Sequence, residues 1–168
     1  MLRSSSTRET ARPRVIRLAG KGALAGLVGG VVFLLLWLLI LGPKITLLLT
    51  GIAVTVTRSQ SPLLGFFEHF AISAIFGAIY AVVLGNLVTL PRYGSSVLFG
   101  LLDGVIWWVL GALVISPLLI GQAPLFAQAF SPPLLVDLVA HLLYGVVTAL
   151  VFTLLVRRAE KVQGERSL

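Results

Sequence analysis

Cysteine is absent from the 168 residues of this chain, and charged side chains are scarce. Without cysteine there can be no disulfides, no thiolate metal sites and no haem attached through a Cys-x-x-Cys-His motif, and the redox compartment cannot be read. Charged residues make up 11% of the chain, against about 25% in soluble domains. Since 58% of the residues are hydrophobic and the mean hydropathy is +1.04, most of the chain is expected to lie in lipid.

Catalytic signatures are missing as well. The chain has no His-Glu-x-x-His, Gly-x-Ser-x-Gly or phosphate-loop motif. Ser73, His69 and Asp137 match a nucleophilic triad by residue type alone, with no signature of an oxyanion hole. We therefore expect no enzymatic activity. The net charge of +7 comes from basic residues that flank apolar runs, so nucleic acid is not expected as a partner.

What the chain does contain is four long apolar runs: Leu18 to Leu41, Phe66 to Leu90, Val97 to Ile120 and Leu134 to Val156. Each run is long enough for a helix to cross a hydrocarbon core of about 30 Å, which takes about 20 residues. Continuous runs rich in Leu, Ala and Gly differ from the alternating segments of a membrane β-barrel. The sequence predicts an all-α, polytopic membrane four-helix bundle over residues 18–156. The lipid bilayer is its expected partner, and a larger membrane complex or a homo-oligomer stays open.

Three segments lie outside these runs. Residues 1–17 are polar and rich in arginine, which predicts a basic disordered tail resting on anionic lipid. Residues 157–168 are expected to form a charged tail. Residues 45–57 are apolar but too short to span, which favours a re-entrant or interfacial segment and leaves its insertion open.

The basic residues also predict the orientation. Of the 13 Lys and Arg residues, eleven lie before or at the start of the first run, between the second and third, or after the fourth, and only Lys44 and Arg58 fall on the other side. Because cytoplasmic segments carry the excess of Lys and Arg, both termini are expected in the cytoplasm of a multi-pass inner-membrane protein.

Glycines recur at four-residue spacing in these runs and predict where helices pack, since a missing side chain lets another backbone approach closely. The expected packing positions are Gly22, Gly26, Gly30, Gly77, Gly85, Gly100, Gly104 and Gly145. Aligning Phe76-Gly77 with Tyr144-Gly145 superposes the second run on the fourth, and residues 22–26 then superpose on residues 100–104. This alignment predicts two tandem two-helix repeats related by a pseudo-twofold axis along the membrane normal.

The same alignment predicts a polar cluster. It sets His69 opposite Asp137 and Ser73 opposite His141, and each pair is spaced i, i+4 on one helix face. If the faces meet, the four side chains can serve as interhelical hydrogen bonds, as a metal site, as haem ligands or as part of a proton-linked transport path. Glu68 points away from this face and is expected to meet Arg58 or the lipid headgroups.

Asp103 is a second intramembrane acid, inside the third run. A carboxylate there costs about 3 kcal/mol and needs protein, water or a cation as a partner. Lys21 and Arg17, which begin the first run at a similar depth, are its expected partners. A role in proton or ion movement is the alternative to this structural pairing.

Several stretches resemble small bacterial four-helix membrane proteins of unknown function, including the YagU-like group. They are GALAGLVGG, ILGP, WWVLGALVISPLLIG and HLLYGVV. The resemblance implies the fold and supplies no catalytic residues. The resulting hypothesis is an integral membrane protein that serves as a non-catalytic structural or accessory subunit. A small proton- or ion-coupled transporter is the alternative, and a haem- or metal-binding redox membrane protein is the third possibility.

Overall fold

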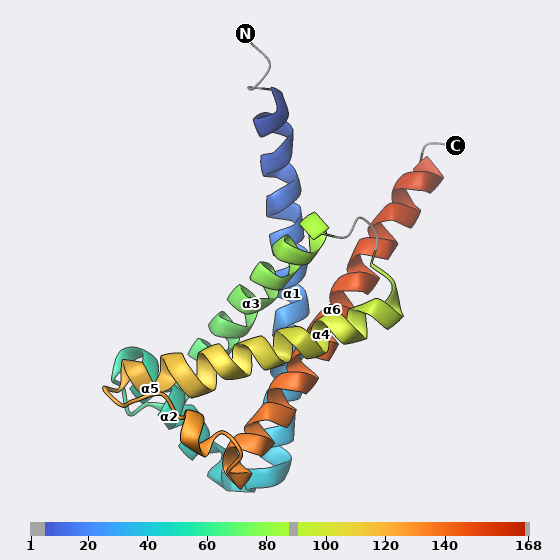
Figure 1. Ribbon diagram of the computed structural model, residues 1–168. Coiled ribbons are helices and arrows are strands. Elements are labelled where there is room, and N and C mark those ends of the chain that lie inside the picture. The colour runs from blue at the N-terminus through green and yellow to red at the C-terminus, as the bar shows by residue number, and fades with distance from the viewer. Residues whose placement is uncertain (1–5, 88–90, 167–168) are drawn as a thin grey trace.

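The computed structural model describes residues 6–87 and 91–166, and Figure 1 shows that they form helices joined by short connections. In chain order the elements are α1 (Ser6–Leu41), η1 (Gly42–Lys44), α2 (Ile45–Thr57), α3 (Pro62–Leu87), α4 (Tyr93–Trp107), η2 (Trp108–Ile115), α5 (Ser116–Leu119), η3 (Phe126–Gln128) and α6 (Pro132–Arg166). No strand occurs within the described ranges, so the all-α prediction is confirmed.

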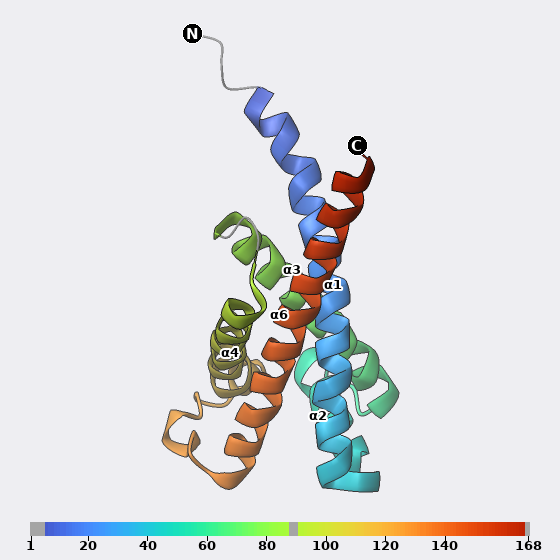
Figure 2. The same ribbon diagram turned by 90° about the vertical axis from the view of Figure 1, so that its right-hand side faces the viewer.

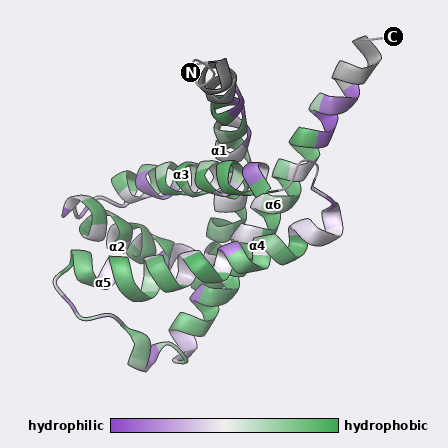
Figure 3. Cartoon of the chain, turned by 45° about the horizontal axis from the view of Figure 1, so that its top comes forward, coloured by the Kyte–Doolittle hydropathy of each residue, from purple (hydrophilic) through white to green (hydrophobic). Residues whose placement is uncertain are grey.

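Four helical segments are long and apolar enough to cross a membrane: residues 14–57, 62–87, 93–119 and 132–161. They confirm the predicted four-helix membrane fold. Hydrophobic residues dominate α2 to α5, and hydrophilic residues gather toward the C-terminal end of α6 (Figure 3). The N- and C-terminal ends of the chain lie at the same end of the molecule, as an even number of crossings requires (Figure 1).

Glycine brings α1 and α3 into backbone contact. A Cβ atom added at Gly22 would overlap the backbone of Gly77, and one added at Gly26 would overlap the carbonyl oxygen of Ser73. Gly77 in turn lies against the backbones of Gly22 and Gly26. No larger residue fits at these positions without moving one helix, so the spacing of the glycines sets the distance between α1 and α3.

The contact between α4 and α6 is built in the same way. A Cβ atom at Gly100 would meet the carbonyl oxygen of Gly145 at 2.6 Å, and one at Gly104 would meet that of His141 at 2.5 Å. Gly145 lies against Gly100 and Gly104. These contacts occupy the positions that the sequence alignment makes equivalent to Gly22, Gly26 and Gly77. Duplication of the helix pair itself stays a prediction.

The four long helices are not paired equally. α1 packs against both α3 and α6, α4 packs against α6, and α2 packs against α3 and contacts α5 of the third span, whereas α3 and α4 make only a small contact. Figure 2 shows α4 on one side of α6 and α1 on the other. The pseudo-twofold axis predicted from the sequence would pair α3 with α4 as it pairs α1 with α6. Instead, α3 and α4 meet at the stacked rings of Phe76 and Trp107, whose centroids are 3.5 Å apart, with a pocket beside them.

Helix extends into both terminal segments, although only the first was predicted to be disordered. Helix α1 already begins at Ser6, so residues 6–17 are not a disordered tail, and α6 continues to Arg166 through most of the segment expected as a charged tail. Residues 1–5 and 167–168 lie outside the described ranges. The physical reason is cooperativity, because extending an existing helix costs far less than nucleating one. Hydropathy marks where the lipid ends, and the helix need not end there.

The segment predicted as re-entrant or interfacial is the helix α2. At about 1.5 Å per residue its 13 residues span about 20 Å, less than the hydrocarbon core. It follows a bend at Gly42, which has a positive φ of 54°, and it ends at Arg58, whose φ of 62° is left-handed. A Cβ atom at Gly65 of α3 would overlap the carbonyl oxygen of Leu49, so α2 packs closely on the start of α3.

The third span contains a π-helical stretch, η2, that the sequence analysis did not predict. The amide of Ser116 bonds to the carbonyl oxygen of Gly111, five residues earlier. Pro117 follows directly, and a proline inside a helix cannot donate to the carbonyl four residues before it. That carbonyl belongs to Leu113, and it accepts the amide of Leu125 at 2.8 Å instead. The outer connection thereby satisfies the backbone group that Pro117 leaves free.

Candidate functional site

His69 joins α3 to α1. Its side chain is 7% exposed, and Nε2 donates a hydrogen bond of 3.0 Å to the carbonyl oxygen of Gly30. The absence of a side chain at Gly30 makes room for this contact, because a Cβ atom there would come within 2.6 Å of Ser73 Oγ and 3.3 Å of His69 Nε2. In a membrane such a bond holds two helices together, since no water competes for the carbonyl.

Tyr144 joins α6 to α3. Its hydroxyl donates a 2.7 Å hydrogen bond to the carbonyl oxygen of Ser73, and its side chain is 4% exposed. The backbone of Tyr144 lies against Gly29 of α1. One residue of the fourth span therefore touches both helices of the first half.

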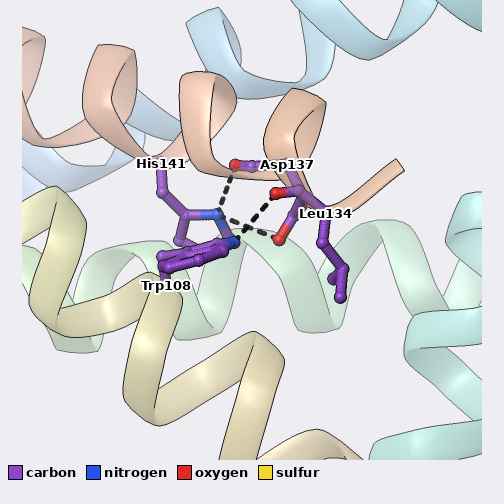
Figure 4. Close-up of polar contacts among 4 residues, drawn as sticks. All are labelled: Trp108, Leu134, Asp137 and His141. Carbon is purple, nitrogen blue, oxygen red and sulfur yellow. Dashed lines mark hydrogen bonds and ion pairs between the residues drawn. The ribbon is translucent and has the colours of Figure 1, made fainter. Parts of the chain in front are cut away.

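His141 and Asp137 form a pair within α6. His141 Nδ1 donates to the backbone carbonyl oxygen of Asp137 at 2.8 Å and lies 3.4 Å from its Oδ2 (Figure 4). Beside them Trp108 Nε1 donates to the carbonyl oxygen of Leu134 at 3.1 Å, which ties η2 to the start of α6 (Figure 4). The histidine–aspartate contact is local to one helix and joins no second element.

Two contacts are seen among the four side chains of the predicted cluster. His69 and Ser73 lie at Gly30, whereas His141 bonds to Asp137 of its own helix. Phe33 of α1 packs on both histidines, with ring centroids 5.2 Å from His69 and 5.1 Å from His141. α1 is thus the common neighbour of the two pairs. A direct meeting of the four side chains stays a prediction, and the alignment did not reveal that α1 contacts both helices.

A metal or haem site gains no support from this geometry. Among the described residues, no group of three His, Cys, Asp or Glu side chains is placed to hold a metal ion. Haem would need a wide slot between two axial histidines. Here both imidazole rings are packed against Phe33, and His69 also contacts Phe70.

Asp103 faces a pocket between α3 and α4. Its Oδ2 is buried and has no hydrogen-bond partner. The predicted pairing with Lys21 or Arg17 is not formed, because among the side chains described in residues 14–87 and 91–161 the one contact at salt-bridge distance is His141–Asp137. The reason lies in the helix order: Lys21 and Arg17 belong to α1, Asp103 belongs to α4, and α6 packs between these two helices.

Glu68 is a second buried acid without a partner. Its side chain is 9% exposed, and neither carboxyl oxygen makes a hydrogen bond. The predicted contact with Arg58 is wrong, since the guanidinium of Arg58 donates to the carbonyl oxygen of Leu119 and ties the end of α2 to the end of α5. Glu68 instead lies within the protein rather than at the headgroups.

Three aromatic residues of this region were missed by sequence reasoning: Phe33, Tyr80 and Trp107. Tyr80 and Trp107 line the pocket beside Asp103, and both their polar atoms are buried without a hydrogen bond. The sequence contained a signal for Tyr80 and Trp107, because a Tyr or Trp inside an apolar run carries a polar atom that needs a hydrogen-bond partner. A tyrosine or tryptophan inside a span is therefore a candidate site residue, as an acid or a histidine is.

A comparison with family models, curated proteins and solved structures finds no match to this chain.

Proposed function

We propose that this chain is a multi-pass membrane protein without catalytic activity of its own, acting as a structural or accessory subunit. The observation that carries the proposal is the small contact between α3 and α4. These spans meet at the stacked rings of Phe76 and Trp107, and beside that contact they expose apolar side chains such as Ile79 and Ile106, on which a further membrane helix can pack. The resemblance to the YagU-like group is consistent with this proposal and adds no activity.

The use of the polar side chains supports the same function. His69 and Tyr144 each bond to a backbone carbonyl of another span. Ser96 and Thr153 bond to each other at 2.6 Å between α4 and α6. These contacts fix helices in place, and the Nε2 atom of His69, which lies near Ser73, is bonded to Gly30, which supports a structural role for this pair.

We also propose that both termini face the cytoplasm of the inner membrane. Arg14 donates to the carbonyl oxygen of Gly85, and Arg157 donates to that of Pro91 and lies 5.3 Å from the ring centre of Tyr93. These basic side chains cluster at the end of the molecule that carries the termini, which the positive-inside rule assigns to the cytoplasm.

The test of the accessory function is the particle that the full chain forms in its native membrane. After extraction in mild detergent, a subunit is expected in a particle heavier than the 17.9 kDa chain, with a second protein in fixed proportion. Deleting the chain should change the mass or abundance of that complex. A chain that is extracted alone, and whose deletion alters no complex, would contradict the proposal.

A proton- or ion-coupled transporter is the second candidate, and a specific observation favours it. Glu68 and Asp103 are buried acids without partners, and they lie in different helices. Intramembrane acids of this kind mark ion pathways by default. Purified protein in vesicles loaded with a pH-sensitive dye would show flux that Asp103→Asn abolishes and Asp137→Asn preserves. Absence of flux in the wild-type chain removes this candidate.

A further inference from the structure

A pocket of about 360 Å³ separates α3 from α4. Its α3 wall includes Ile79, Tyr80 and Val83, and its α4 wall includes Phe99, Asp103 and Trp107. The stacked rings of Phe76 and Trp107 bring the two helices together beside it. Its volume falls within the range of sites that hold small organic molecules.

Asp103, Tyr80 and Trp107 are the lining residues that carry polar side-chain atoms, and the other seven are apolar. Asp103 Oδ2, the Tyr80 hydroxyl and Trp107 Nε1 are buried in the pocket wall, and Trp107, one helical turn after Asp103, can donate to its carboxylate. No basic side chain lines the pocket, so the carboxylate lies in an apolar environment without a counter-cation, which is unfavourable. A few polar groups in a mostly apolar pocket are the pattern of a ligand site, in which they orient a mostly apolar molecule.

The pocket opens toward lipid. Ile79, Val83, Leu102 and Ile106 line it and are also exposed side chains of the spans. Asp103 lies ten residues beyond Tyr93, about 15 Å along the helix axis, and within the third membrane-spanning segment. A ligand can therefore enter from the surrounding lipid.

We propose that this pocket binds a free lipophilic amine, with its ammonium group paired to Asp103. A carboxylate selects a cation that can donate a hydrogen bond, and no basic side chain of the protein lines the pocket to compete for it. The aromatic rings of Tyr80, Phe99 and Trp107 favour a cation further. The leucine and isoleucine walls accept an apolar body. This site goes beyond the accessory function and does not rest on it.

The test uses two rigid probes of similar shape and different charge. Radiolabelled 1-aminoadamantane carries an ammonium group, and 1-adamantanol is its neutral counterpart. Equilibrium binding of each is measured to the full chain in phosphatidylcholine nanodiscs, with binding to protein-free nanodiscs subtracted. The amine is expected to bind saturably and at least tenfold more tightly than the alcohol.

Two pairs of variants locate the binding. Asp103→Asn removes the charge and should weaken amine binding about tenfold or more, whereas Asp137→Asn, at the acid outside the pocket, should leave it unchanged. Ile79→Phe fills the pocket and should abolish binding. Ile75→Phe adds the same bulk one helical turn away at another exposed position and should preserve it.

Four results would overturn the proposal. They are no saturable binding of the amine to folded protein, equal binding of the amine and the alcohol, undiminished binding to Asp103→Asn, and equal losses in Ile75→Phe and Ile79→Phe. A further arm replaces part of the phosphatidylcholine by phosphatidylethanolamine. Unchanged amine affinity is expected there, whereas competition by this lipid would assign the pocket to a headgroup amine and reject the free ligand.

Discussion

At the scale of single residues, the buried polar atoms of this protein fall into two kinds. Some bond to a backbone carbonyl of another helix, as His69 and Tyr144 do. Others have no partner, and they lie both at the pocket, as the hydroxyl of Tyr80 does, and away from it, as the carboxylate of Glu68 does. The first kind holds helices together, and the second kind adds no hydrogen bond to the fold.

Two tyrosines allow this distinction to be measured. Tyr144→Phe removes the bond to Ser73 and should lower the free energy of unfolding by about 1 kcal/mol. Tyr80→Phe makes the same chemical change at a similarly buried residue whose hydroxyl has no partner, so it should cost nothing. Reversible unfolding in mixed micelles with rising dodecyl sulfate, followed by tryptophan fluorescence, compares the two. Equal losses would show that the 2.7 Å contact contributes no stability.

Residue spacing predicted contacts along one helix better than partners across helices. The i, i+4 relation of Asp137 and His141 appears as a real contact, because it depends only on helix geometry. The expected partner of Asp103 was chosen by depth alone. Two residues at the same depth in the membrane need not lie on neighbouring helices, and α6 packs between the helices that carry Lys21 and Asp103.

At the scale of helices, the glycine crossings determine how closely the spans approach. Gly77 at the α1–α3 crossing and Gly145 at the α4–α6 crossing each face the backbone of the opposite helix. Association of helices in lipid depends on close packing rather than on a hydrophobic driving force. Small residues at these two positions are therefore expected to matter more than the size of the apolar side chains around them.

Single methyl groups test the crossings. Gly77→Ala and Gly145→Ala should each destabilise the protein by about 1–3 kcal/mol, because the added Cβ meets backbone atoms that cannot move aside. Gly20→Ala is the matched control in α1, where nothing lies within 4 Å of an added Cβ. It should be neutral or stabilising by up to about 1 kcal/mol, since alanine favours helix. Thermal denaturation in detergent measures the melting temperatures of all three variants. If the three values were similar, the glycines at the two crossings would not determine how closely the helices pack.

Sequence predicted the spans well and their ends poorly. The four apolar runs coincide with four helical segments because transfer into lipid requires apolar side chains and internal backbone hydrogen bonds. Helix ends in water follow other rules, so α1 and α6 extend past the lipid-facing residues. Predicting the π-helix would have required two facts together. Pro117 leaves the carbonyl of Leu113 without its usual helical donor, and the amide of Leu125, which is distant in sequence, bonds to that carbonyl instead.

At the scale of the whole molecule, the order of helices is the feature that sequence could not supply. Faces that contact lipid and faces that contact another helix are both apolar, so hydropathy does not distinguish them. The repeat predicted a symmetric arrangement in which α3 meets α4 as α1 meets α6. The open α3–α4 edge departs from that symmetry, and the pocket with Asp103 lies in the gap.

The absence of cysteine makes the proposed orientation directly measurable, because a single introduced thiol is the only one in the chain. Gln60→Cys lies between α2 and α3, and Gln122→Cys lies between α5 and α6; both positions are exposed. Gly94→Cys is exposed at the start of α4, near the other end. In intact cells a membrane-impermeant maleimide should label the first two, and the third should react only after lysis, because basic residues keep its end in the cytoplasm. The reverse pattern would place the termini outside, and labelling of all three would contradict the four-span topology.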